Sequence, residues 1–233
     1  MLHNHLVMFK KRENIVEIEE GKLLSPKFDN DGLIPVITMC SKTKDILMHG
    51  YMNVEAFKTI LTWMGEDPSR EGLLETPKRV VKAFKEYFGG YTEDANKILE
   101  KTFGDVEGYD DMVVEKNISV SSHCEHHMAP IVGTAHVAYI PNERVVGLSK
   151  LARVVEVFSK RLQTQERLTM QVAQALMTSL DAKGVAVTID AAHQCMTMRG
   201  IKKENATTVT NYFLGEFKKD LSIQNRYLRF ISK

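Results

Sequence analysis

The alternation of apolar and polar residues predicts β-strands in the second half of the chain. At 185–191 every odd position is apolar, while the polar Thr188 and Asp190 fall between them, and this period of two is typical of a strand with one buried face. Further strands or short extended segments are predicted at 33–39, 113–121, 132–140 and 145–147. Pro130 marks the reversal between the two long strands.

Apolar residues recur at helical spacing in four other segments, namely 53–64, 77–88, 149–162 and 168–180. Thr76 is expected to cap the second of these helices, with Pro77 at its first helical position and Gly89 and Gly90 ending it. Ser149 is expected to cap the third helix. Strands and helices in this order predict an α+β domain, an antiparallel sheet with helices packed on one face.

Length and composition describe an ordinary globular chain. The 233 residues suffice for one main domain with an appendage, and 43% hydrophobic and 26% charged residues are typical of soluble proteins. No apolar run approaches the ~20 residues of a membrane helix, and the opening residues do not resemble a signal peptide. The net charge of +1 gives no general attraction to nucleic acid or membranes. Three cysteines form no disulfide framework, so we expect a reducing cytosol.

The candidate chemistry lies in two short runs, Cys124-Glu-His-His127 and His193-Gln-Cys195. Cys124, His127 and Cys195 are ligands of the types that zinc prefers. Cys124 and His127 suit a turn after a strand, and His193 and Cys195 continue the parity of the strand at 185–191 toward its buried side. A catalytic zinc site leaves one coordination position open for water, and His126 and His193 then remain for proton transfer. Taken singly, Cys124 and Cys195 are more typical of buried apolar thiols than of metal ligands.

Other polar residues suggest an anionic substrate. Ser149, Lys150 and Arg153 open a predicted helix, whose free N–H groups and two cations suit a phosphate. Arg199 adds a cation close to Cys195.

Gln165 and Glu166 lie between two predicted helices and match the donor and acceptor edge of a guanine or a pterin. A solvated turn in which Glu166 has a capping role is an equally good interpretation of these two residues.

Four runs of sequence resemble GTP cyclohydrolase I, in order and at the family's spacing: 124–127, 147–153, 161–169 and 193–200. Residues 70–79 are similar to the N-terminal helix signature of the same family, and the likeness extends from about 53 to 230. The resemblance implies the T-fold (tunnelling fold), in which an antiparallel sheet backed by helices forms a ring-forming subunit with an N-terminal helical extension. It also implies a decamer of two face-to-face pentameric rings, with active sites shared between subunits.

The resemblance further implies the reaction and the residues that carry it out. GTP is hydrolysed and rearranged to 7,8-dihydroneopterin triphosphate and formate, the first step of tetrahydrofolate and pterin biosynthesis. Zn²⁺ would be bound by Cys124, His127 and Cys195, and protons would be moved by His126 and His193. The substrate-binding residues carried over are Gln165 and Glu166 for guanine, and Ser149, Lys150, Arg153, Arg199 and a neighbouring subunit's Arg79 for the triphosphate.

The first 52 residues depart from this pattern. Segments 28–37 and 46–56 resemble the opening of phosphoribosyl-AMP cyclohydrolase, but the metal motifs of that family do not follow. We therefore predict an N-terminal extension at 1–52, a truncated fusion without its own activity, and a GTP cyclohydrolase I domain at 53–233.

Two alternatives to this enzyme remain open from the sequence. A structural zinc module would recruit a fourth protein ligand, His126 or His193, and would unfold on chelation. A related T-fold enzyme would act on a deazaguanine or a pterin rather than on a nucleoside triphosphate.

Overall fold

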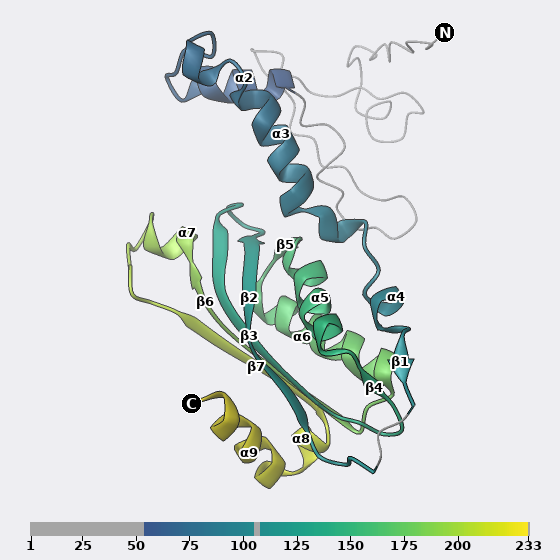
Figure 1. Cartoon of the computed structure of the whole chain (residues 1–233). Coiled ribbons are helices and arrows are strands. Elements are labelled where there is room, and N and C mark those ends of the chain that lie inside the picture. Colours follow the sequence, from purple (N-terminus) through teal and green to yellow (C-terminus); the bar gives the residue numbers. More distant parts are fainter. Residues whose placement is uncertain (1–53, 105–107, 233) are drawn as a thin grey trace, which may run out of the picture. The chain divides into compact units, whose positions relative to one another are not determined.

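The computed structural model of the chain describes residues 54–104 and 108–232. The chain divides into two compact units, Met1–Tyr51 and Met52–Lys233. The strand predicted at 33–39 and the N-terminal extension therefore lie outside the described residues. Within the second unit, a strongly twisted sheet and the helices packed on it form an α+β domain (Figure 1), as the sequence predicted.

The N-terminal part of the described chain is mainly helical, with elements α2 (Val54–Trp63), η1 (Glu71–Leu73), α3 (Thr76–Tyr87), η2 (Gly89–Tyr91), α4 (Ala95–Leu99) and β1 (Thr102–Phe103). The sheet and its helices follow, with β2 (Val113–Cys124), β3 (Pro130–Ile140), β4 (Val145–Val146), α5 (Leu148–Ser159), β5 (Leu162–Gln163), α6 (Gln165–Leu180), β6 (Gly184–His193), α7 (Gln194–Thr197), β7 (Thr208–Gly215), α8 (Glu216–Lys219) and α9 (Leu221–Ile231). Among these described helices, none combines the length and the apolar character needed to cross a membrane.

The main sheet has five strands in the order β5-β2-β3-β6-β7. All neighbours are antiparallel except β5, which runs parallel to the end of β2. His123 pairs with Pro130 across β2 and β3, and Ile131 pairs with His193 across β3 and β6. This register brings the last residues of β2 and β6 to the same end of the sheet.

The core between the sheet and the helices α4, α5 and α6 is apolar and continuous. It takes the odd residues of β6, such as Val185 and Ile189, together with Leu151 of α5 and Leu176 of α6, all 0% exposed. Gly90 lets η2 approach α5 closely, because a Cβ there would lie 2.0 Å from the carbonyl oxygen of Val157.

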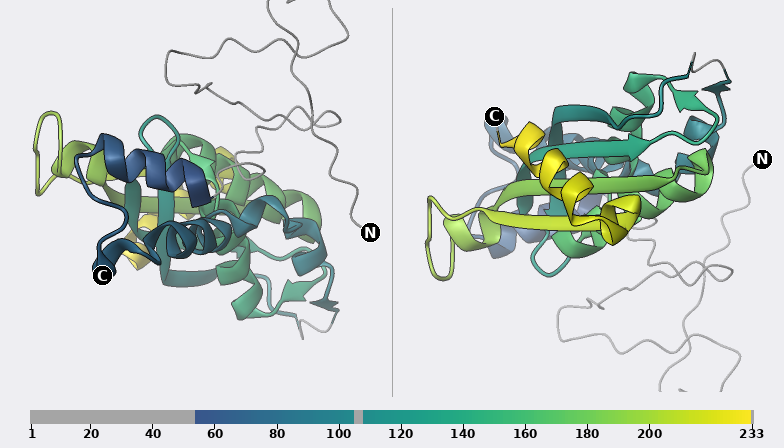
Figure 2. Two further views of the ribbon diagram at one scale, coloured as in Figure 1. Left: turned by 90° about the horizontal axis from the view of Figure 1, so that it is seen from above. Right: turned by 90° about the horizontal axis from the view of Figure 1, so that it is seen from below.

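The other face of the sheet is also covered at one end, which corrects the prediction of helices on one face only. Ala138 and Ala186 pack there with Phe217 of α8 and Tyr227 of α9, and Figure 2 shows the C-terminal helix lying across the strands. Residues at even positions of β6, such as Ala186, are therefore buried as well. The alternation of apolar and polar residues at 185–191 indicated only one of the two buried faces of this strand. The strand β7 and the helices α8 and α9 were not predicted.

Several predicted boundaries were wrong by a few residues. The cap of α5 is Gly147, so Ser149 is already helical, and Leu162 belongs to β5 instead of that helix. Glu75 precedes α3 as its cap, and Thr76 is its first residue. Such shifts arise because capping and strand pairing compete for the same few residues at an element's end.

Candidate metal centre

Cys124 and His127 lie on a tight turn at the end of β2. The Cys124 N–H donates to the carbonyl of Ala129 (2.8 Å), and the Met128 N–H donates back to the carbonyl of Cys124 (2.7 Å). Met128 takes a left-handed conformation with φ 52°, which reverses the chain in few residues. Cys124 is thus the last residue of the strand instead of a loop residue, and the turn returns His127 toward its thiol.

Cys195 reaches the same place from β6. The strand ends at His193 and the chain continues as α7, so Cys195 is helical and does not extend the strand's alternation as predicted. The ligand atoms of Cys124, His127 and Cys195 nevertheless all lie within 4.8 Å of one another. The proximity of these three side chains, expected from the sequence, is confirmed.

The donor set fits a zinc ion. The Cys124 Sγ lies 3.8 Å from the His127 Nδ1, close to the roughly 3.6 Å edge of a tetrahedron with ordinary Zn–S and Zn–N bonds. Burial raises the pKa of the Cys195 thiol, and the adjacent Cys124 raises it further. Two neighbouring thiolates are therefore unfavourable unless a cation lies between them.

His126 flanks the cluster and is linked to α6. Its Nδ1 lies 3.7 Å from the Cys124 Sγ, and its Nε2 lies 3.9 Å from Glu125. Glu125 in turn forms an ion pair with Arg167, which also donates to the carbonyl of Leu162 (2.9 Å). Sequence reasoning missed this Glu125–Arg167 pair, since only the pairing of β2 with β5 brings the two residues together.

His193, the last residue of β6, is held by Gln165. The His193 Nε2 lies 2.7 Å from the Gln165 Oε1. Gln165 is only 1% exposed, and its amide nitrogen donates to the carbonyls of Ile189 (3.0 Å) and Thr208 (2.7 Å). Burial lowers the pKa of His193, and the nearby Glu166 carboxylate opposes this shift.

Gln165 and Glu166 belong to the first turn of α6 and not to a connection between helices. The helix is capped by Thr164, whose hydroxyl accepts from the Arg167 N–H (3.3 Å). Glu166 is exposed, in contrast to its buried neighbour. Arg199 is also exposed and follows α7, four residues after Cys195.

The other predicted substrate-binding residues lie farther from the cluster along their helices. The C-terminal end of α5 leads to Leu162, which pairs with His123. Ser149 and Lys150 lie in the first turn of this 12-residue helix, at its opposite end, and Arg153 lies near its middle, about 9 Å along the axis from Ser159. The rings of Tyr87 and His123 are 5.0 Å apart, and Arg79 precedes Tyr87 by about 12 Å of helix.

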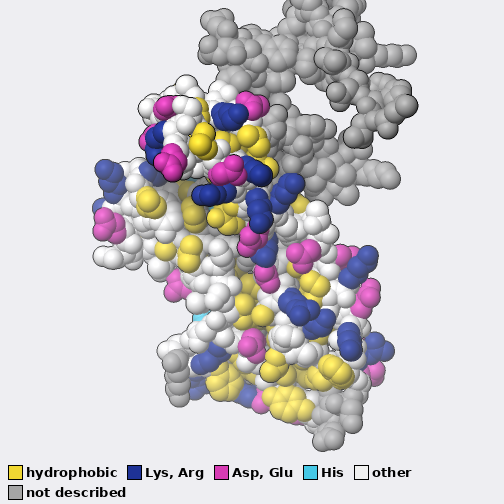
Figure 3. All heavy atoms as spheres, turned by 45° about the horizontal axis from the view of Figure 1, so that its top comes forward, with side chains coloured by type: hydrophobic (Ala, Val, Ile, Leu, Met, Phe, Trp, Pro, Cys, Tyr) yellow, Lys and Arg dark blue, Asp and Glu magenta, His cyan; other side chains and the backbone are white. Residues whose placement is uncertain are grey.

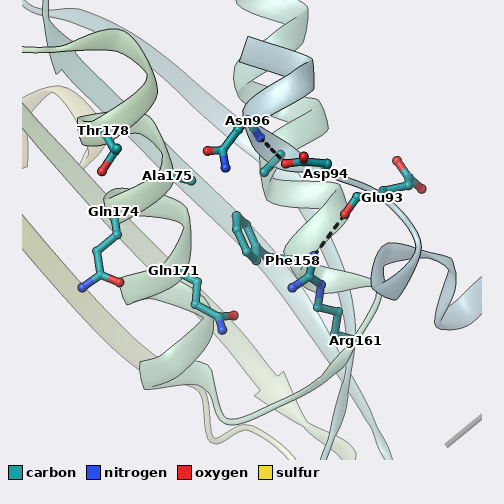
Figure 4. A pocket seen from close by; sticks show the side chains of 10 residues that line it. Glu93, Asp94, Asn96, Phe158, Arg161, Gln171, Gln174, Ala175 and Thr178 are labelled. Carbon is teal, nitrogen blue, oxygen red and sulfur yellow. Dashed lines mark hydrogen bonds between the residues drawn. The ribbon is translucent and has the colours of Figure 1, made fainter. Parts of the chain in front are cut away.

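A separate groove lies between α4 and α6, away from these residues (Figure 4). It has a volume of about 480 Å³ and is lined by Phe158, Arg161, Gln171, Gln174 and Thr178, among others. None of its lining residues belongs to the metal cluster. On the molecular face in Figure 3, basic and acidic side chains are interspersed without a large area of one sign.

Comparisons with known proteins identify the family. The model of the family described as GTP cyclohydrolase I matches residues 53–232. The chain is 99% identical over 179 residues, 77% of this chain and 89% of the relative, to "GTP cyclohydrolase 1" of Pelagibacter ubique. It is 57% identical over 76% of this chain and 87% of the relative to the protein of that name from Maricaulis maris.

A third relative, "GTP cyclohydrolase 1" of Brucella canis, is 52% identical over 87% of this chain and 96% of its own length. The cluster of Cys124, His127 and Cys195 lies inside the matched region. With a family match over most of its length and relatives this similar, the chain belongs to the GTP cyclohydrolase I family, and its domain has the T-fold.

Proposed function

We propose that this chain hydrolyses and rearranges GTP to 7,8-dihydroneopterin triphosphate and formate, using zinc held by Cys124, His127 and Cys195. The observation that carries the proposal is the convergence of these three ligand atoms within 4.8 Å, beside His126 and His193, in a chain of the GTP cyclohydrolase I family. Within the described residues the candidate metal group contains three ligands, and His126 is not among them. A closed structural zinc site has four protein ligands, so three ligands favour a catalytic site.

When bound, zinc supplies a Lewis acid that makes water nucleophilic near neutral pH. The chain's residues then manage the protons of the reaction. Attack at C8 of the guanine requires a proton at N7, and the release of formate requires proton transfers as the ring opens. His126 and His193 lie beside the cluster and have side chains suited to this exchange.

Recognition of GTP would depend on the exposed polar groups. Glu166 is exposed at the first turn of α6 and can accept from the ring N–H and the exocyclic amine of guanine. The NH₂ group of Gln165 is held by the carbonyls of Ile189 and Thr208, so Gln165 would contact the base through its carbonyl oxygen. Ser149, Lys150, Arg153, Arg199 and Arg79 would neutralise the triphosphate.

We infer that the active sites are shared between subunits of a decamer built from two pentameric rings. Lys150 and Arg153 lie about 14 and 9 Å along α5 from its C-terminal residue Ser159, so a triphosphate beside Cys124 would reach such cations more readily on another copy. A cytosolic location accords with the two free thiols of the site. Residues 1–52 would be an extension without activity of its own.

The experiment is a turnover assay with purified, zinc-loaded protein and GTP, in which formate is measured and dihydroneopterin is detected by fluorescence after oxidation. The matched variant is Cys195→Ser, which we expect to lose bound zinc and formate release together, while its circular dichroism stays that of a folded protein. Turnover by a metal-free variant would contradict the proposal. Unfolding of the wild type on chelation, with a fourth protein ligand, would instead indicate a structural zinc module.

A further inference from the structure

The hydrogen bonds of Gln165 determine which way round its amide lies. One end of the amide faces the carbonyl oxygens of Ile189 (3.0 Å) and Thr208 (2.7 Å), which can only accept. That end must therefore be the NH₂ group. The other end, which faces the Nε2 of His193 at 2.7 Å, is then the carbonyl oxygen.

A carbonyl oxygen at this position requires a hydrogen on the facing ring nitrogen. We infer that Gln165 orients the His193 ring and holds it in the Nε2–H tautomer, which leaves Nδ1 as the unprotonated ring nitrogen. Gln165 is then a positioning residue for His193. The assignment of the tautomer stands on the contacts alone, whereas its use in catalysis rests on the proposed function.

The contact between His193 and Gln165 fits only one assignment of the neutral ring. A hydrogen on Nε2 can donate to the Gln165 Oε1 at 2.7 Å, whereas a bare Nε2 would set two lone pairs against each other. Among the described residues, His193 Nδ1 has no hydrogen-bond partner. Nδ1 is accordingly the ring nitrogen left to contact substrate or water.

Gln165 is itself fixed firmly enough to orient a neighbour. Its amide nitrogen links the adjacent strands β6 and β7 through Ile189 and Thr208, and its backbone carbonyl accepts from the hydroxyl of Thr169 (2.7 Å). The side chain is buried, and both hydrogens of its NH₂ are used within the protein. Its carbonyl oxygen faces the His193 Nε2, so the same network fixes the position of this ring.

The direct test is the protonation of the His193 ring in zinc-loaded protein. Solid-state nitrogen NMR of ¹⁵N-histidine-labelled protein distinguishes protonated from unprotonated ring nitrogens, and His193→Gln identifies the His193 signals. We expect Nε2 protonated and Nδ1 unprotonated in the wild type, and a mixture of tautomers in Gln165→Met. The control is Gln163→Met, because Gln163 is equally buried at 1% exposure and donates to the carbonyl of Phe158 (2.9 Å).

Gln163 makes no described hydrogen bond to His193, so Gln163→Met should leave the wild-type tautomer in place even where it costs similar stability. A wild-type His193 protonated on Nδ1 when neutral, or an unchanged tautomer in Gln165→Met, would overturn the inference. This readout does not depend on turnover.

The kinetic test separates positioning from guanine binding. We expect Gln165→Met to lower kcat about 10- to 100-fold while KM for GTP stays within about threefold. A large rise in KM with kcat unchanged would mean that Gln165 binds the base, and would overturn the inference. If the wild type makes no dihydroneopterin triphosphate, the proposed function fails while the NMR result still decides the tautomer.

Discussion

His136 illustrates at the scale of one residue how the sheet constrains an ionisable group. It is 9% exposed, and its Nδ1 accepts from the N–H of Asn117 (3.3 Å) at the bulge in β2. Burial is the main cause that lowers its pKa below 6.5; Lys116 lowers it further, and Asp190 opposes the shift. The folded protein therefore binds a proton at this residue less readily than the unfolded chain does.

The predicted consequence is a loss of stability in acid. Above pH 6.5 His136 is mostly neutral in both the folded and the unfolded state. As the pH falls through this value, the unfolded chain gains a proton first. The free energy of unfolding therefore decreases until the pH passes the lowered pKa of the folded state. We expect His136→Gln to reduce the fall in the free energy of unfolding between pH 8 and pH 5, because the substituted side chain does not titrate. Urea unfolding of the wild type and of His136→Gln at both pH values, at one protein concentration, measures this difference. The same pH dependence of the free energy of unfolding in the two proteins would contradict the prediction.

At the scale of elements, α9 is attached to the sheet by one buried phenol. Tyr227 is 0% exposed, and its hydroxyl lies 3.0 Å from the carbonyl oxygen of His136 and 2.9 Å from the Thr188 Oγ1. Its ring packs edge-on against Phe217. The hydroxyl thus joins α9 to both β3 and β6, on the face opposite the core that contains Cys124.

We predict that Tyr227→Phe lowers the free energy of unfolding by about 1–2 kcal/mol, because the ring contacts remain while the acceptors lose their donor. Turnover of GTP per folded active site should stay within about twofold of the wild type, since the substitution lies on the other face of the sheet. Thermal unfolding and initial rates give the two values. A large loss of activity at unchanged stability would show that this face is coupled to the site.

At the scale of the molecule, the sheet has two incompletely paired edges within the described part of the chain. The strand β5 pairs only with His123 and Cys124, so most of β2 has no neighbour on that side, and β7 is the last strand on the other. Exposed edges of this length favour pairing with other copies, and a closed ring removes them. This arrangement supports the proposal of sites shared between subunits.

Complementation tests the shared site. The variants Cys195→Ser and Arg153→Ala should each be nearly inactive alone. If Cys195 and Arg153 of one site come from different chains, co-expression of the two variants should restore about a quarter of the wild-type sites. The reason is that half of the chains keep Cys195 and half of their neighbours keep Arg153. Mass measurement of differently tagged chains verifies that mixed oligomers form. Mixed oligomers without recovered turnover would contradict the sharing of these two residues.

The sequence by itself determined the ligand types, the long strands and helices, and the family. Cys124, His127 and Cys195 could be selected because thiolates and imidazole are zinc ligands wherever they occur, and local periodicity predicted β2, β3, β6, α5 and α6. Their proximity was expected from the ends of two strands and is confirmed.

Only the tertiary structure decided which polar groups meet. The sequence did not predict the contacts of Gln165: the pairing of β6 with β7 puts two carbonyl acceptors beside its amide nitrogen, and its oxygen faces His193. Cys195 was expected on a strand and lies on α7. A sequence pattern reports the face of an element that is buried, whereas hydrogen-bond partners depend on the register between segments far apart in the chain.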